Sequence, residues 1–531
     1  MSTIAESLPA SDATADSAPL RFVTAASLFD GHDAAINIMR RLIQAQGAEV
    51  IHLGHNRAVE DVVRAALQED ADAIALSSYQ GGHVEYFKYM VDMLRERGAS
   101  HIRVFGGGGG TITPEEIREL QAYGVERIYH PNDGMHLGLV AMIEDVVSRA
   151  ARARESGIGL RRQEAGANSE AGPKGEPRSR RVNPEATNKS ISDAATIDDE
   201  ISIGRMLTAI ENGDFSETEL AKLRKSWASG PAHSPFPMPH SRPATPVIGI
   251  TGTGGAGKSS VVDELLLRFL HAFPDIRIAV LAVDPTRRRS GGALLGDRIR
   301  MNALRSHRVF MRSMATRRQH AATSLVLKDC VSFLKGQGYD LVIVETAGIG
   351  QSDSEIVDLV DFPMYVMTSD YGAASQLEKI DMIDYAELIV LNKFDKRGAE
   401  DALRDVRKQW KRNRVAFQLK DDEVPVYPTI ASQFNDPGIT WMFTNLCRLL
   451  RHKLGIGNGE SAIDWKPDLD TSLKEPRATV LIPGARVRYL AEIADQGRGI
   501  NATIEKQAGI ADRAQSYWQS LHDIDDTALP K

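Results

Sequence analysis

Cysteine is nearly absent from this chain of 531 residues, which contains only Cys330 and Cys447. Two cysteines so far apart cannot build the disulfide framework of a small secreted domain or a cysteine-rich zinc site. No apolar run approaches the ~20 residues that a membrane span needs, and residues 1–20 are small, polar and acidic rather than signal-like. We therefore expect a cytoplasmic protein without a membrane span.

A strong excess of charge of one sign is also missing. The chain has 64 Lys and Arg against 71 Asp and Glu, which gives a net charge of −7, and the two signs are interspersed. Such a pattern lacks the basic footprint of a protein that binds nucleic acid or an anionic membrane surface. We expect neither as a partner, and the length leaves room for two or three domain cores.

A glycine-rich motif in residues 247–260, VIGITGTGGAGKSS, is the most specific signal. An apolar strand runs into a glycine-rich loop and then into the helical pattern VVDELLLRFL. In such a phosphate-binding loop the backbone N–H groups surround the phosphates, Lys258 reaches the outer ones, and the Ser259 hydroxyl can bind Mg²⁺. A glycine-rich turn can arise by chance, but the strand and helix supply the required context. The candidate nucleotide-binding residues are Gly254, Gly255, Ala256, Gly257, Lys258, Ser259 and Ser260.

A second motif predicts which base is bound. Residues 388–395, LIVLNKFD, form an apolar strand that ends in Asn392, Lys393 and Asp395. A carboxylate at this position can accept hydrogen bonds from N1–H and the 2-amino group of guanine, and adenine offers no such donor pair. An isolated NKxD motif is weak, but after a phosphate loop it predicts GTP, because a site built for this pairing rejects the wrong base.

Two further strands end in acidic residues, at Asp284 in IAVLAVDP and at Glu345 in LVIVETAG. The carboxyl edge of a doubly wound sheet is its ligand crevice. These carboxylates are therefore candidates for holding Mg²⁺, and Gly348 could donate its N–H to the γ-phosphate. Singly, each would more often be a solvated loop acid. Residues 287–300 are rich in Gly and Arg and are predicted to form a mobile switch over the phosphates, with an exposed basic loop as the alternative.

These motifs, with VDPTRRRSGGALLGDRIRM and ETAGIGQSD, make residues 245–455 similar to the metallochaperone-type P-loop GTPases of adenosylcobalamin-dependent acyl-CoA mutases. The resemblance implies slow GTP hydrolysis, with a water-activating residue that we do not assign. It implies Lys258, Asp284, Glu345 and Arg300 as catalytic candidates, and Arg300 as a contact of the nucleotide. The Mg²⁺ cluster that it implies is Ser259, Asp284, Asp297, Glu345 and Thr346.

Residues 21–150 alternate strand and helix patterns, with strands in RFVTAASL, EVIHLG, AIALSSY, IRVFGG and ERIYH. This alternation predicts a small flavodoxin-like parallel sheet. After the first strand, His32 follows Asp30 by two residues. A histidine at a strand's carboxyl end suits a metal ligand whose other ring nitrogen is held by a carboxylate, although alone it would more often be an ordinary loop residue.

Glycines follow two neighbouring strands of this region, in SSYQGGH and in the run from Gly106 to Gly110. Glycine allows a bulky ligand to approach the backbone, although tight turns would also use it. Together with Asp30 and His32, the pattern resembles the cobalamin-binding domain of the base-off, His-on class. The resemblance implies His32 as the lower cobalt ligand and Asp30 as its partner, with Ala35 and Tyr79 departing from the motif. Gly31, Ser77, Tyr79, Gly109 and Gly110 would contact the cofactor. A flavodoxin-like module for phosphate or flavin is the alternative.

The expected organisation is a disordered tail (1–20), a cobalamin-binding domain (21–150), a polar linker with short helices (151–240), a P-loop GTPase domain (241–456) and a helical extension (457–531). Asp214 and Ser216 are predicted helix caps. Residues 477–525 carry an amphipathic pattern with an expected break near Gly497 to Gly499. We expect either a helix pair on the GTPase or a connector to a further domain.

This order of domains resembles the fused isobutyryl-CoA mutases, in which a substrate-binding barrel follows. The resemblance implies adenosylcobalamin, GTP and Mg²⁺, and a GTPase module that gates loading and protection of the cofactor for conversion of isobutyryl-CoA to n-butyryl-CoA by a methylmalonyl-CoA mutase-type enzyme. Expected partners are a mutase barrel domain or subunit, an adenosyltransferase and further copies of the chain. No mutase activity is expected from this chain alone. The alternatives are a stand-alone GTPase chaperone, or a P-loop kinase or transport ATPase with a flavodoxin-like regulatory domain.

Overall fold

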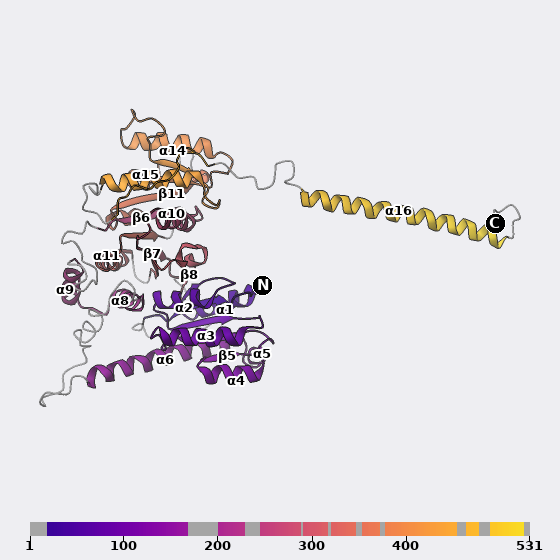
Figure 1. The fold of residues 1–531 in the computed structure, drawn as a ribbon, viewed down its shortest axis with the longest axis horizontal. Helices are drawn as coiled ribbons and strands as arrows, with labels where there is room; N and C mark the ends of the chain where they lie inside the picture. Colours follow the sequence, from indigo (N-terminus) through magenta and orange to yellow (C-terminus); the bar gives the residue numbers. More distant parts are fainter. Residues whose placement is uncertain are drawn as a thin grey trace. The chain divides into compact units, whose positions relative to one another are not determined.

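The computed structural model describes residues 18–167, 200–228, 245–287, 290–316, 320–346, 353–371, 377–453, 463–476 and 489–524. It divides into two compact units, residues 1–476 and residues 477–531. The first unit contains two parallel sheets, one of six strands and one of seven (Figure 1). None of the helices in the described ranges is long and apolar enough to cross a membrane.

The first sheet begins with five strands in the order β2-β1-β3-β4-β5, all parallel. The strands are β1 (Arg21–Ala26), β2 (Glu49–His52), β3 (Ala73–Ser77), β4 (Arg103–Gly107) and β5 (Arg127–Tyr129). The helices between and after them are α1 (Asp33–Ala45), α2 (Val59–Gln68), α3 (His83–Glu96), α4 (Pro114–Tyr123), α5 (Pro131–Leu137) and α6 (Leu139–Ala167). Strands β1 to β3 are buried along their whole length because helices cover both faces. The predicted flavodoxin-like fold is confirmed.

The second sheet has the order β13-β12-β11-β6-β10-β7-β9 and is also parallel. Its strands are β6 (Val247–Gly252), β7 (Ile278–Asp284), β9 (Val309–Ala315), β10 (Leu341–Thr346), β11 (Phe362–Thr368), β12 (Leu388–Asn392) and β13 (Val426–Thr429). Its main helices are α10 (Lys258–Ala272), α11 (His320–Gly336), α14 (Ala399–Asn413) and α15 (Pro437–Lys453). Cys330 on α11 and Cys447 on α15 are free and buried. The predicted doubly wound sheet is confirmed.

A sixth strand of the first sheet comes from the second half of the chain. Strand β8 (Ala293–Leu295) pairs in parallel with β2, with Ala293 opposite Glu49 and Leu295 opposite Ile51. Just before it, Gly292 lies so close to the end of α1 that an added Cβ would collide with the Gln44 carbonyl and lie 2.7 Å from the Ala48 carbonyl oxygen. This segment was expected to be a switch loop over the phosphates. Instead, the described part of it contains strand β8, which pairs with the first sheet, and the short helix η1 (Asp297–Arg300).

One helix connects the two sheets, and a second packs on the same helix of the second sheet. Helix α8 (Glu200–Asn212) contacts both α2 and α11, and α9 (Glu217–Ala228) packs on α11. Ser216 caps α9, since its hydroxyl accepts from the Glu219 N–H at 3.4 Å and its own N–H donates to the Glu219 carboxylate at 2.8 Å. The predicted cap at Ser216 is confirmed.

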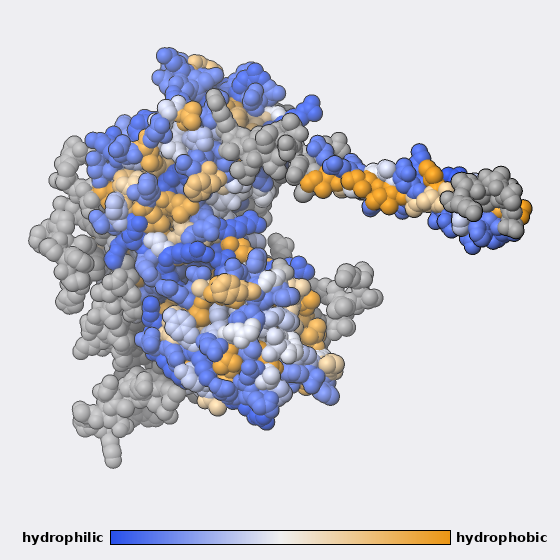
Figure 2. Space-filling view, turned by 45° about the vertical axis from the view of Figure 1, so that its right-hand side comes forward, coloured by the Kyte–Doolittle hydropathy of each residue, from blue (hydrophilic) through white to orange (hydrophobic). Residues whose placement is uncertain are grey.

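The second unit contains one long helix, α16 (Tyr489–Asp523). The expected break near Gly497 to Gly499 is wrong, because the helix continues through both glycines. Glycine in a helix interior costs about 1 kcal/mol relative to alanine, and the neighbouring helix-forming residues outweigh this cost. Exposed apolar residues recur along one side as Ile493, Ile500 and Ile504, and the apolar stripe is visible in Figure 2.

Candidate functional sites

The phosphate-binding loop lies between β6 and α10, at the carboxyl edge of the second sheet. Gly257, the residue before α10, has φ 94°, and a Cβ there would lie 2.5 Å from Asn392 Nδ2. Only glycine fits this left-handed, closely packed position. The Lys258 ammonium donates to the carbonyl oxygens of Gly252 at 3.0 Å and Thr253 at 3.3 Å. Its charge is therefore held against the loop itself, where phosphates would be received.

Acidic side chains from three segments meet at the start of α10. The Ser259 hydroxyl oxygen lies 2.8 Å from Glu345 Oε1 and 3.2 Å from Asp297 Oδ1. Burial, and after it the Asp297 carboxylate, raises the pKa of Asp284 to about 7. The same two causes raise the pKa of Glu345 to about 8. The sheet edge thus forces like charges together in a poorly solvated place, which a divalent cation would relieve.

The donor atoms of this cluster fit a cation such as Mg²⁺. Glu345 Oε2 is buried without a hydrogen-bond partner, and carboxylate and hydroxyl oxygens are the ligands that Mg²⁺ prefers. Within the described ranges, no three His, Cys, Asp or Glu side chains already stand in the positions of a formed metal site. The cluster therefore supplies ligand chemistry rather than a preformed cage, and its role as a Mg²⁺ site stays a prediction.

The other residues predicted for this site are Thr346, Arg300 and Gly348. The Thr346 hydroxyl donates to Thr251 Oγ1 at 2.9 Å, so it faces β6. Arg300 is exposed on the short helix η1 (Asp297–Arg300), whereas Arg298 of the same turn is buried. The role of Arg300 stays a prediction. Gly348 and its predicted contact with the γ-phosphate lie outside the described residues.

The NKxD motif lies directly against the phosphate loop. Asn392 Nδ2 donates to the Ala256 carbonyl at 2.8 Å, and Lys393 Nζ donates to the Gly255 carbonyl at 2.8 Å. Lys393 has φ 57°, which turns the chain away from β12, and Asp395 follows as an exposed carboxylate. The strand ends therefore bring the two motifs together across 136 residues of sequence, as predicted.

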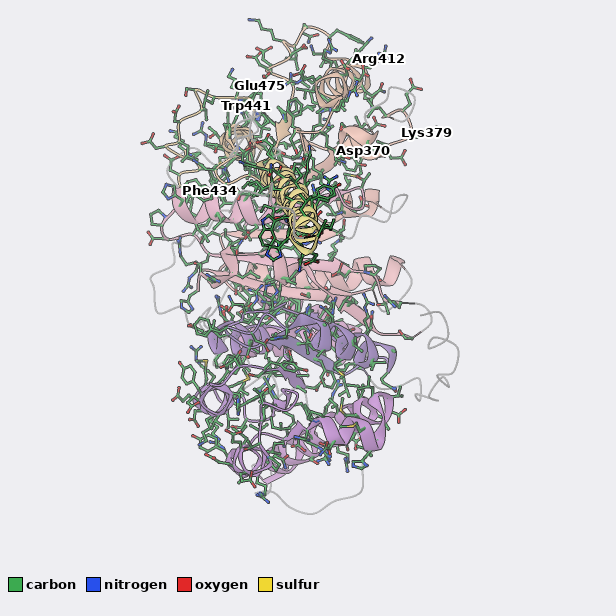
Figure 3. The ribbon with its side chains drawn as sticks, turned by 90° about the vertical axis from the view of Figure 1, so that its right-hand side faces the viewer. Asp370, Lys379, Arg412, Phe434, Trp441 and Glu475 are labelled. Carbon is green, nitrogen blue, oxygen red and sulfur yellow. The ribbon has the colours of Figure 1, made fainter. Side chains whose placement is uncertain are left out.

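The residues that orient this motif were not among those predicted from the sequence. Asn392 Oδ1 accepts from Thr429 Oγ1 at 3.1 Å, at the last residue of β13, and from the Ala431 N–H at 3.0 Å, two residues further on. The strand pattern VPVYPT followed by small residues was the available signal. Asp370, labelled in Figure 3, accepts from Lys396 Nζ at 2.7 Å and so holds the loop that carries Asp395. No pattern in the sequence indicated that pair.

On the first sheet, the structure places Asp30 and His32 as a ligand pair requires. Asp30 is 2% exposed, and its Oδ1 accepts from His32 Nδ1 at 2.9 Å and from the His32 N–H at 2.8 Å. Its Oδ2 accepts from the Tyr79 N–H at 2.8 Å. The His32 side chain is 75% exposed. With Nδ1 held by the carboxylate, Nε2 carries the free lone pair that a metal would use.

The neighbouring strand ends offer a place for a ligand tail. Ser77 Oγ at the end of β3 is buried without a hydrogen-bond partner. Gly109 has φ 59°, and the Tyr79 ring covers it so closely that a Cβ would lie 2.6 Å from Tyr79 Cε1. A Cβ on Gly110 or Gly31 would meet nothing within 4 Å. The unpaired Ser77 hydroxyl and the open space at Gly31 and Gly110 therefore fit the binding of a bulky cofactor.

The fold and the two sites define a cobalamin-binding domain joined to a P-loop GTPase, and comparisons with known proteins agree. Residues 20–135 match the B12 binding domain family. Residues 238–452 match the methylmalonyl Co-A mutase-associated GTPase MeaB family. The predictions of a B12-binding domain and of a GTPase of this type are therefore confirmed.

Among known relatives, the chain is 49% identical to the fused isobutyryl-CoA mutase of Geobacillus kaustophilus over 93% of this chain and 42% of that protein. It is 48% identical to the fused isobutyryl-CoA mutase of Cupriavidus metallidurans over 95% of this chain and 42% of that protein. The GTPase ArgK of Escherichia coli is 36% identical over 28% of this chain and 44% of that protein. The predicted resemblance to fused isobutyryl-CoA mutases is confirmed, and the chain spans less than half the length of these relatives.

Proposed function

We propose that this chain holds adenosylcobalamin on its first sheet and uses GTP hydrolysis with Mg²⁺ to gate the loading and protection of that cofactor. The Asp30–His32 pair carries the proposal, because a buried carboxylate holds one ring nitrogen and leaves the other exposed. When bound, adenosylcobalamin would supply the radical chemistry that rearranges an acyl-CoA carbon skeleton. Ser77, Tyr79, Gly109 and Gly110 would hold its displaced tail.

The absorbance spectrum of added adenosylcobalamin tests this proposal. The full chain should give the spectrum of a base-off, His-ligated cobalamin, and His32→Ala should abolish it. His136→Ala is the matched control, because His136 is exposed on α5 of the same domain. An unchanged spectrum in His32→Ala would reject the axial ligand.

For the GTPase, we propose that Ser259, Asp284, Asp297, Glu345 and Thr346 hold Mg²⁺ directly or through water. Lys258 would contact the outer phosphates, Arg300 the nucleotide, and Asp395 the guanine base. Such a site accelerates phosphoryl transfer by positioning and by stabilising charge. The support is the orphaned Glu345 oxygen and the raised pKa values of two buried carboxylates.

Phosphate release from GTP tests this assignment. We expect slow hydrolysis that stops when EDTA removes Mg²⁺ and weakens in Ser259→Ala, which loses a proposed ligand. Ser332→Ala is the control, because Ser332 is a half-buried serine on α11 whose hydroxyl donates to the Lys328 carbonyl of its own helix. A chain that binds GTP but releases no phosphate with Mg²⁺ would count against the acidic cluster.

The complete enzyme would convert isobutyryl-CoA to n-butyryl-CoA, and the acyl-CoA would bind to a mutase barrel domain or subunit. We propose that this chain alone has no mutase activity, assembles as a homo-oligomer and receives its cofactor from an adenosyltransferase. Mixing the loaded chain with a separately expressed mutase barrel should restore isomerisation. If the pair stays inactive while each part binds its own ligand, the stand-alone chaperone is the better description.

A further inference from the structure

The short helix η1 connects the acidic cluster of the second sheet with the loop that follows β2 in the first sheet. Asp297, its first residue, lies at the Ser259 hydroxyl, 3.2 Å away. Ile299, two residues later, reaches the first sheet. Its carbonyl oxygen accepts from Arg57 Nη2 at 3.1 Å, and its side chain lies against Gly54, where an added Cβ would be 2.8 Å away. One turn of backbone therefore contacts both the acidic cluster and the loop that follows β2.

From Arg57 the contacts continue to the loop that presents His32. The Arg57 N–H donates to the Ala26 carbonyl at 3.2 Å, at the end of β1. Next to it, Asn56 Oδ1 accepts from the Phe29 N–H at 2.8 Å, and Phe29 directly precedes Asp30. Phe29 and Asn56 have φ of 63° and 55°, a region that non-glycine residues rarely adopt. This pair of hydrogen-bonded loops is thus held in one specific conformation.

The Arg57 side chain ties these segments together. It is half-buried, and its Nε donates to the Leu53 carbonyl at 2.6 Å while Nη2 reaches Ile299. The side chain therefore connects the end of β2 with the turn that begins at Asp297. A shift of that turn would move the Arg57 guanidinium, and with it the backbone that positions Phe29 and Asp30.

Another arginine crosses the same interface without reaching the cofactor loop. Arg64 on α2 donates to the carbonyls of Leu304 at 2.7 Å, Ser306 at 2.9 Å and Val309 at 2.9 Å. It makes more hydrogen bonds to the second domain than Arg57 does. Arg64 is therefore a matched comparison that separates domain docking from transmission to His32.

We propose that Arg57 is a positioning residue that couples the occupancy of the nucleotide site to the placement of the His32 loop. The inference rests on the proposed function, in which GTP with Mg²⁺ binds at Ser259 and Asp297 and cobalamin binds at His32. A cation that draws Asp297 toward Ser259 shifts Ile299, and Arg57 carries the shift to the loop before Asp30. Such coupling is reciprocal, so each ligand changes the affinity of the other by the same factor.

The test measures adenosylcobalamin affinity of the full chain with and without Mg²⁺ and a non-hydrolysable GTP analogue, and the reciprocal affinity. In the unmodified chain each ligand should change the affinity of the other by at least about fivefold. Arg57→Met should reduce this factor below about twofold, while each ligand alone binds as before and the His-ligated spectrum is retained. Arg57→Lys should restore part of the coupling, because one donor remains. Arg64→Met should keep it.

Three outcomes would overturn the inference: no mutual effect in the unmodified chain, full coupling in Arg57→Met, or equal loss in Arg64→Met. If Arg57→Met does not fold, Asn56→Gly replaces it, since glycine accepts the φ of 55° and only the side-chain acceptor is lost. Asn56→Gly should then lose the coupling, and full coupling there rejects the path. A chain that binds no cobalamin overturns the proposed function as well, whereas one that binds both ligands independently overturns only the coupling.

Discussion

At the scale of single residues, Asp395 is the carboxylate proposed to select the nucleotide. It is exposed after Lys393, whose ammonium is fixed on the phosphate loop at the Gly255 carbonyl. Its neighbours Asn392 and Lys393 supply the hydrogen bonds to the phosphate-binding loop, so the Asp395 carboxylate does not take part in holding that loop. The choice of base can therefore be changed without disturbing the loop.

Asp395→Asn should weaken GTP binding by about tenfold to a hundredfold, because the guanine donors would face an amide instead of a carboxylate. Xanthosine triphosphate should gain affinity, since its 2-oxo group can accept from the new amide. Competition titrations with both nucleotides provide the measurement. Asp401→Asn is the control, an exposed aspartate on α14 paired only with Arg404. Equal preference for GTP in Asp395→Asn and the unmodified chain would assign base recognition elsewhere.

Residues whose function depends on their own chemistry and on a fixed local spacing could be predicted from the sequence. Lys258, Ser259 and Asn392 fall where their motifs predict, because a strand end determines where the next residues point. The partners that orient them were not predictable. Thr429 and Ala431 act through a hydroxyl and a backbone N–H, and the pattern VPVYPT indicates the end of a strand there without indicating these two contacts.

At the scale of elements, strand β8 has an unusual position. It pairs with β2 of the first sheet, although in the sequence it lies between β7 and β9 of the second sheet. It stands between Asp284 and Asp297, both proposed Mg²⁺ ligands, and pairs with β2. Its three residues, Ala-Leu-Leu, are too short to predict a strand, and the partner strand lies more than 240 residues away in sequence. Pairing at such a separation is decided by packing rather than by local propensity.

Gly292→Ala should disturb this strand, since the new Cβ would collide with the Gln44 carbonyl and lie 2.7 Å from that of Ala48. Overpacking of this kind costs about 1–3 kcal/mol, so urea should unfold the variant at lower concentration. Binding of GTP with Mg²⁺ should also weaken, because both ends of the segment reach the acidic cluster. Gly296→Ala is the control in the same segment, where a Cβ meets nothing within 4 Å. Equal stability of the two variants would mean that β8 is not fixed on the first sheet.

At the scale of the whole molecule, a buried ionic network joins the two sheets. Glu69 at the end of α2 bonds Arg298 Nε at 2.7 Å, Ser313 Oγ at 2.9 Å and Arg21 Nη1 at 3.3 Å. Its side chain is fully buried, and Arg21 also bonds Glu49 at 2.8 Å. Burial lowers the pKa of Arg21, but the carboxylates of Glu211, Glu49 and Glu69 together outweigh this effect and raise it above its usual value. The network is thus made of fully paired charges from segments far apart in sequence.

Glu69→Gln should lower the free energy of unfolding by about 3–5 kcal/mol, because two buried guanidinium groups lose a shared carboxylate while the side chain keeps its volume. Urea unfolding monitored by tryptophan fluorescence gives this value, and the loss should appear in the transition of residues 1–476, which form one compact unit. The control is Glu119→Gln, whose ion pair with Lys88 is partly exposed and should contribute about 0–1 kcal/mol. If both variants lose the same free energy of unfolding, apolar packing joins the two sheets, and the charge of Glu69 is not needed for this. A loss confined to Glu69→Gln, with one unfolding transition for residues 1–476, would mean that the buried network couples the unfolding of the cobalamin domain to that of the GTPase.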